Sequence, residues 1–162
     1  MDKDALIVWK SRIFDYQKQV RESLPPQQTT LFDLIPTHCD PDSIDPFSLR
    51  LITMQFWRMP TDSPGHPCIY FVVDTQLPIV LYVGESFQSN QRWKGVHDCK
   101  RYVEKYHDLH YKHGLERAVS IAFWFDTPAD RTARLDLEHH LIKRWRSPFN
   151  KECWKWWGQP FQ

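Results

Sequence analysis

The stretch CIYFVV at residues 68–73, followed by IVLYVG at residues 79–84, decides the fold of this chain. Both runs are rich in β-branched and aromatic residues, which favour β-strands. The connector between them contains Pro78, a residue that interrupts strands and suits turns. Two strand-like runs joined in this way predict an antiparallel β-hairpin.

The length of the connector sets which residues face each other across this hairpin. Five residues, 74–78, separate the two runs, so we expect Val73 opposite Ile79 and Tyr70 opposite Tyr82. Directly opposed residues share a face of the sheet, which would place two phenol groups side by side. Most cross-strand aromatic pairs only pack against each other, so this pair gains chemical meaning from the residues that follow.

The chain after the hairpin contains a series of residues suited to phosphate chemistry. They are, in order, Gly84, Ser86, Arg92, His97, Glu138 and, after Ser147 and Pro148, Asn150. Arg92 stands ten residues after Tyr82, and Asn150 stands twelve residues after Glu138. Over residues 68–150, this order and spacing resembles the GIY-YIG nuclease superfamily.

The resemblance implies an α+β fold in which helices flank a small three-stranded antiparallel sheet. This domain would cover residues 68–162, and residues 1–67 would form a helical and irregular extension packed on it. Two positions depart from the family pattern. Cys68 replaces the first glycine of the motif, and His97 lies five residues after Arg92, where four is more usual in the family.

The resemblance also implies an activity, that of a metal-dependent endonuclease that hydrolyses DNA phosphodiester bonds. Glu138 would hold one divalent ion, Mg²⁺ or Mn²⁺. Tyr70 would take a proton from the attacking water while Tyr82 orients the water or the phosphate, and the two tyrosines could exchange these roles. A tyrosine has an ordinary pKa of about 10, and a nearby arginine and a cation would both favour the phenolate.

Further residues take supporting roles by the same resemblance. Arg92 would stabilise charge on the phosphate, His97 would assist proton movement, and Asn150 would fix the end of the helix that carries Glu138. The residues expected to contact the substrate are Gly84, Ser86, Lys94, Lys100 and Arg101.

The surroundings of Glu138 are a reason, independent of the resemblance, to single it out. Residues 127–130, with Thr127 as N-cap, predict the start of the last long helix. One face of that helix is apolar, formed by Leu135, Leu137, Leu141, Ile142 and Trp145. Glu138 falls near the middle of this face, where a carboxylate needs a partner. An i,i+4 salt bridge to Arg134 and a bound metal ion are both open.

The segment between the hairpin and the last helix predicts another helix and a third strand. The helix would start after Ser89 and end at Gly114, and residues 118–125 would form the strand. Arg92 lies on the apolar stripe of the predicted helix. Its guanidinium group could donate two parallel hydrogen bonds to a phosphate, or it could form an ion pair with a carboxylate such as Glu138.

The distribution of charge favours a polyanionic partner at the second half of the chain. The net charge is only +1, which argues against strong non-specific DNA binding by the whole molecule. Residues 1–85 carry 7 Lys or Arg against 11 Asp or Glu, whereas residues 86–162 carry 14 against 9. DNA, with branched and single-stranded forms both open, is therefore the expected partner.

Composition predicts a cytoplasmic protein with no membrane partner. Neither an apolar run of membrane-spanning length nor a signal-peptide pattern at MDKDALIVWK is present in the sequence. The four cysteines, Cys39, Cys68, Cys99 and Cys153, are scattered and form no CxxC pair. They are typical of reduced thiols.

Segments outside the motifs support several interpretations. Residues 3–23 predict an amphipathic helix, followed to residue 67 by a proline-rich stretch with short elements at residues 30–35 and 49–57. The tail CWKWWG, residues 153–158, could stack on bases, join two copies in a homodimer, or pack on its own core. The histidine series His107, His110 and His113 is a weak zinc motif, and a solvated helix face is the favoured interpretation of it.

Two other functions remain open at this point. The displaced His97 and the missing first glycine would suit a catalytically weak module that binds nucleic acid or protein on the same fold. The tryptophan-rich tail would suit a structural partner protein.

Overall fold

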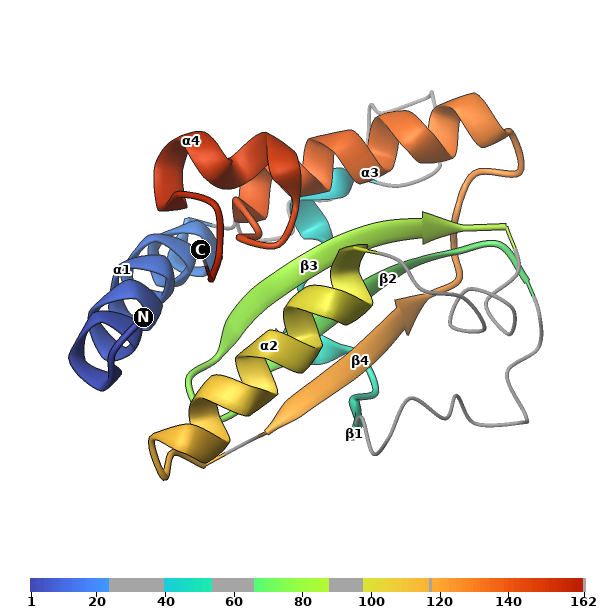
Figure 1. Ribbon diagram of the computed structural model, residues 1–162. Helices are drawn as coiled ribbons and strands as arrows, with labels where there is room; N and C mark the ends of the chain where they lie inside the picture. Colours follow the sequence, from blue (N-terminus) through green and yellow to red (C-terminus); the bar gives the residue numbers. More distant parts are fainter. Residues whose placement is uncertain (24–39, 54–65, 88–97, 117, 162) are drawn as a thin grey trace.

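The computed structural model describes residues 1–23, 40–53, 66–87, 98–116 and 118–161 (Figure 1). The α-helices are α1 (Lys3–Glu22), α2 (Asp98–Lys112), α3 (Arg131–Trp145) and α4 (Trp154–Trp157). The strands are β1 (Ile52–Thr53), β2 (Cys68–Asp74), β3 (Ile79–Ser86) and β4 (Val119–Trp124). Short 3₁₀ helices are η1 (Pro41–Ser43), η2 (Pro46–Ser48) and η3 (Lys151–Cys153). The predicted α+β class is confirmed.

The predicted number of strands is wrong, because the described residues form a four-stranded antiparallel sheet in the order β1-β4-β2-β3. The additional strand comes from the N-terminal extension, where Ile52 pairs with Ile121 of β4. Its two residues are too few to show the alternation by which a strand is recognised in sequence. The short element expected at residues 49–57 contains β1 in its described part, whereas residues 54–57 and the element expected at residues 30–35 lie outside the described residues.

The predicted hairpin register is also wrong, because Tyr70 pairs with Gly84 instead of Tyr82, and Tyr82 pairs with Val72. Asp74, not Val73, pairs with Ile79. The Asp74 carboxylate accepts hydrogen bonds from main-chain N–H groups of the turn, at 2.8 Å and 3.4 Å, which draws this residue into the hairpin end. If this register continued along the hairpin without interruption, Tyr82 and Tyr70 would lie on different faces of the sheet.

A β-bulge in β3 restores the shared face of the two tyrosines. The register shifts by one residue, and Leu81 is the extra residue. The Leu81 carbonyl accepts from the N–H of Phe149 at 2.9 Å, so a segment distant in sequence supports the bulge. The rings of Tyr70 and Tyr82 consequently lie 5.9 Å apart between centroids. The prediction that they share a face is confirmed.

The sheet separates two apolar clusters, and Figure 1 shows α2 crossing one face of the strands. On that face, α1 and α2 bury residues that include Leu6, Ile13 and Val103 together with Tyr70. On the other face, α3 buries Leu137, Leu141, Ile142 and Trp145 against alternate strand residues. No helix in the described part of the chain is long and apolar enough to cross a bilayer.

The boundaries of α3 differ from the prediction. Its N-cap is Asp130, whose carboxylate accepts from the N–H of Ala133 at 2.8 Å, and not Thr127. Leu135, expected on the apolar face, is 41% exposed, while Arg134 is buried there. Gly114 follows the end of α2 as predicted, with a φ of 62° that glycine adopts readily. The predicted start of that helix at Ser89 lies outside the described residues.

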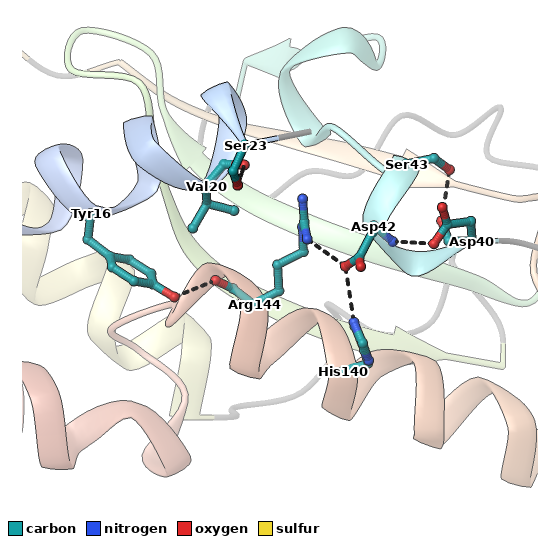
Figure 2. Close-up of polar contacts among 8 residues, drawn as sticks. All are labelled: Tyr16, Val20, Ser23, Asp40, Asp42, Ser43, His140 and Arg144. Carbon is teal, nitrogen blue, oxygen red and sulfur yellow. Dashed lines mark hydrogen bonds and ion pairs between the residues drawn. The ribbon is translucent and has the colours of Figure 1, made fainter. Parts of the chain in front are cut away.

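Residues of the extension contact the C-terminal half of α3 (Figure 2). Asp42 of η1 accepts from Arg144 and lies 3.3 Å from the ring nitrogen of His140. From the other side, the Tyr16 hydroxyl of α1 donates to the Arg144 carbonyl at 3.0 Å. Arg144 is thus held between two parts of the first half of the chain.

The tryptophan-rich tail packs on its own chain. Trp157 of α4 donates its indole N–H to the Arg146 carbonyl and lies edge-on to Tyr16. Trp154 lies edge-on to Tyr102. Of the three interpretations of the tail, intramolecular packing is the one that these contacts support, and a homodimer through it stays a prediction.

A buried polar cluster joins α1, the end of β2 and α2. Lys10 Nζ lies 2.8 Å from Asp74 Oδ2 and 3.0 Å from His110 Nε2. The Tyr106 hydroxyl donates to the same Asp74 oxygen at 2.5 Å, and the His110 Nδ1–H donates to the Tyr106 carbonyl at 2.8 Å. With Nδ1 protonated, Nε2 is the acceptor for Lys10, so His110 is neutral and both ring nitrogens are engaged.

This cluster predicts a pH-dependent stability. Burial lowers the pKa of His110 below its ordinary 6.5, with Lys10 and His107 adding repulsion. The unfolded chain then binds the proton more readily, so stability is full above about pH 6.5 and falls as the pH drops below it. Urea unfolding between about pH 7.5 and 5.5 should show this loss, and His110→Gln should flatten it.

The exposed His139 offers a matched control for this measurement. His139→Gln removes an imidazole that is not part of the buried cluster and should leave the pH dependence of unfolding as in the wild type. Equal pH dependence in wild type and His110→Gln would contradict the assignment of the effect to His110.

Candidate active site

A pocket of about 510 Å³ lies beside β3 and α3. Tyr82 of β3, Asp98 at the start of α2 and several residues of α3 line it, together with the segment that follows α3. The residues with polar side chains are Tyr82, Asp98, Asp136, Glu138, His139, Asn150, Lys151 and Glu152. The fold therefore brings Tyr82, Glu138 and Asn150 together from three separate motifs.

Glu138 reaches the end of β3 from the middle of α3. Its Oε1 accepts from the main-chain N–H of Glu85 at 2.8 Å, and the residue is half-buried. Arg134, which the sequence offered as a salt-bridge partner for Glu138, binds the Glu85 side chain at 2.9 Å. The structure thus adds Glu85 and Arg134 to the site. Sequence reasoning missed this pair because its members are far apart along the chain.

Side-chain amides occupy the hydrogen-bonding edge of β3. Asn150 Oδ1 accepts from the Val83 N–H at 3.0 Å, and its Nδ2 donates to the Val83 carbonyl at 2.9 Å. Gln17 of α1 binds the N–H and carbonyl of Val80 in the same way, at 2.7 Å and 3.0 Å. The C-cap of α3 is Arg146, and the bonds of the Asn150 amide to Val83 put it at the edge of β3, in the place of a neighbouring strand.

The two tyrosines differ in their access to the pocket. Tyr82 is half-buried and lines it, whereas Tyr70 is fully buried behind Tyr82. Gly84, expected to contact substrate, lies against Tyr70, and a Cβ there would come within 2.4 Å of the Tyr70 hydroxyl. Ser86 is also buried, 5% exposed. These positions of Gly84 and Ser86 are explained by packing in the hairpin.

The basic residues near the pocket form a chain of ion pairs. Lys151 Nζ lies 2.7 Å from Asp98 Oδ2, and Arg101 lies 2.9 Å from Asp98 Oδ1. The pKa of Lys151 is raised, chiefly by its hydrogen bond to Asp98, so this side chain stays positively charged. Lys100 is half-buried on the same helix as Arg101. Lys151 was missed by sequence reasoning, which had no motif to mark it.

Three of the predicted site residues, Arg92, Lys94 and His97, lie outside the described residues. Cys68, which stands at the first glycine position of the motif, is buried in β2. Burial and the neighbouring Glu85 charge raise the pKa of its thiol to about 12. The thiol is therefore protonated at neutral pH and unsuited to act as a nucleophile.

The donors of the pocket suit a hard cation bound through few protein ligands. Among the residues that the structure describes, no three His, Cys, Asp or Glu side chains are grouped to hold a metal ion. Magnesium commonly takes one or two carboxylates and keeps several waters. Glu138 in a pocket with room for water fits that pattern.

The contact between Gly84 and Tyr70 predicts that Gly84→Ala destabilises the protein. The added methyl group would force the buried ring to move, and such overpacking typically costs about 1–3 kcal/mol. Urea unfolding of four proteins, wild type, Gly84→Ala, Tyr70→Leu and the double variant, measures the coupling. The loss from Gly84→Ala should be smaller in the Tyr70→Leu background, and an equal loss in both would exclude this contact as the cause.

Comparison of the chain with protein-family models, curated proteins and solved structures found no match.

Proposed function

We propose that this protein is a metal-dependent endonuclease that hydrolyses DNA phosphodiester bonds in the pocket beside β3. The observation that carries the proposal is the meeting of Tyr82 and Glu138 in one pocket, although the two residues belong to different motifs and different layers of the fold. A phenol and a carboxylate in one pocket suit proton transfer and cation binding, respectively. The motif order over residues 68–150, which resembles the GIY-YIG nucleases, agrees with this chemistry.

Burial of Tyr70 favours Tyr82 as the general base. A base must come within hydrogen-bond reach of the proton that it takes, and Tyr82 lines the pocket whereas Tyr70 lies behind it. Tyr70 then supports the ring of Tyr82 at 5.9 Å and keeps it turned toward the pocket. This is the exchanged version of the two roles expected from the sequence.

Glu138 is the residue proposed to hold Mg²⁺ or Mn²⁺. A divalent ion bound there would supply positive charge to offset the charge of the reacting phosphate. The positively charged Lys151 stands at the same pocket and is suited to bind a neighbouring phosphate of the substrate. Arg92 is proposed, by the resemblance, to stabilise the phosphate under attack.

A binding module on the same fold is the second candidate function. Its support is that Asn150, Gly84 and Tyr70, three of the motif positions, have complete structural explanations in the hairpin and its edge. A protein that kept these residues for its fold could bind nucleic acid without cleaving it. Cleavage assays separate the two candidates.

The first functional prediction is that Glu138→Gln abolishes cleavage and leaves the fold intact. The amide is nearly isosteric but is a poor ligand for a hard cation. The assay uses plasmid, branched and single-stranded DNA with Mg²⁺ or Mn²⁺. Asp136→Asn, a neutral change on the same helix and in the same pocket, is the matched control and should remain active. Full activity of Glu138→Gln would remove the proposed metal role.

The second functional prediction compares the two tyrosines. Loss of a general base typically costs about 10²- to 10⁴-fold in rate, so Tyr82→Phe should lower kcat by such a factor. Tyr70→Phe keeps the supporting ring and should retain most of the activity. Single-turnover cleavage at saturating metal measures both variants. A large loss in Tyr70→Phe with an active Tyr82→Phe would reverse the assignment.

A further inference from the structure

We infer that Arg134 is a positioning residue. By binding the Glu85 side chain, it holds the end of β3 so that the main-chain N–H of Glu85 orients the Glu138 carboxylate. The functional part of this inference rests on the proposed function, because Glu138 is the proposed metal ligand. The structural part stands on hydrogen bonds alone.

Arg134 joins the loop before α3 to the end of β3. Its side chain is 1% exposed, and its Nε donates to Glu85 Oε1 at 2.9 Å. Its Nη1 donates to the carbonyls of Pro128 and Ala129 at 3.1 Å and 2.7 Å. A guanidinium with several donors in a fixed plane can hold three acceptors in one arrangement, which a lysine ammonium does not reproduce.

Glu85 is the link between Arg134 and the pocket. Its carboxylate is bound by Arg134, and its main-chain N–H donates to Glu138 Oε1 at 2.8 Å. Arg134 and Glu138 stand four residues apart in α3 and so share a face of this helix. Glu85 is therefore bound twice by one turn of α3, through its side chain by Arg134 and through its main-chain N–H by Glu138. These two contacts set the orientation of the Glu138 carboxylate.

The ion pair also balances charge at this point. The side chain of Glu85 is only 10% exposed, and an unpaired carboxylate there would be costly and would repel Glu138. Arg134 thus compensates the charge of Glu85 close to the carboxylate of Glu138. Residues that hydrogen-bond to a metal ligand commonly affect metal affinity, because they fix the orientation of that ligand.

The test uses Arg134→Met combined with Glu85→Gln, which removes both charges together and leaves no unpaired buried ion. Arg131→Met, at an exposed arginine of the same helix, is the matched control. Circular dichroism and thermal unfolding establish that each variant is folded. Arg134→Lys, which keeps the charge but not the fork of donors, tests rescue.

The first readout is amide hydrogen exchange at Glu85, which reports its bond to Glu138 without any need for metal or substrate. The Glu85 amide should exchange faster in the double variant, whereas the Val83 amide, held by Asn150, should be unchanged. The second readout is the Mn²⁺ concentration for half-maximal cleavage, which should rise by about 10- to 100-fold while the KM for DNA stays constant. Arg134→Lys should fall between wild type and the double variant.

The outcomes separate this inference from the proposed function. An unchanged Glu85 amide in the folded double variant, or an unchanged Mn²⁺ requirement in an active one, would overturn the positioning role. A wild-type protein that cleaves no DNA would refute the proposed nuclease, and the exchange at Glu85 would still decide whether Arg134 orients Glu138.

Discussion

The open edge of β3 is the constraint on which the rest of this structure depends. Among the described residues β3 is an edge strand of the sheet, and its outward N–H and C=O groups need partners. Four groups from other parts of the chain provide them: the amides of Gln17 and Asn150, the N–H of Phe149 and the carboxylate of Glu138. The edge is thereby closed to another strand, and α1 and the segment after α3 are fastened to the sheet.

This closure also creates the pocket. A neighbouring strand would fill the space along β3 continuously, whereas side chains reach the edge at separate points and leave room between them. The pocket lies there, lined by Tyr82 from the strand, Glu138 from α3 and Asn150 from the following segment. The same contacts that satisfy the backbone therefore bring the candidate catalytic groups together. The proposed chemistry depends on how this edge is closed.

The residues of the motifs divide into two groups according to what they contact. Tyr70, Gly84 and Asn150 are buried in the hairpin or bound to its edge. Tyr82, Glu138 and Lys151 line the pocket. The first group holds the second in place, as Tyr70 does for Tyr82, and the buried pair of Arg134 and Glu85 extends this support to Glu138.

The sequence by itself determined the local elements: the hairpin, the last long helix and the glycine that ends α2, because propensity, periodicity and turn chemistry act over a few residues. Only the tertiary structure decided the register. The Leu81 bulge that turns Tyr82 toward Tyr70 is supported by Phe149, and Glu85 meets Arg134 across the gap between β3 and α3. Such partners are distant along the chain, so no local pattern of residues predicts these contacts.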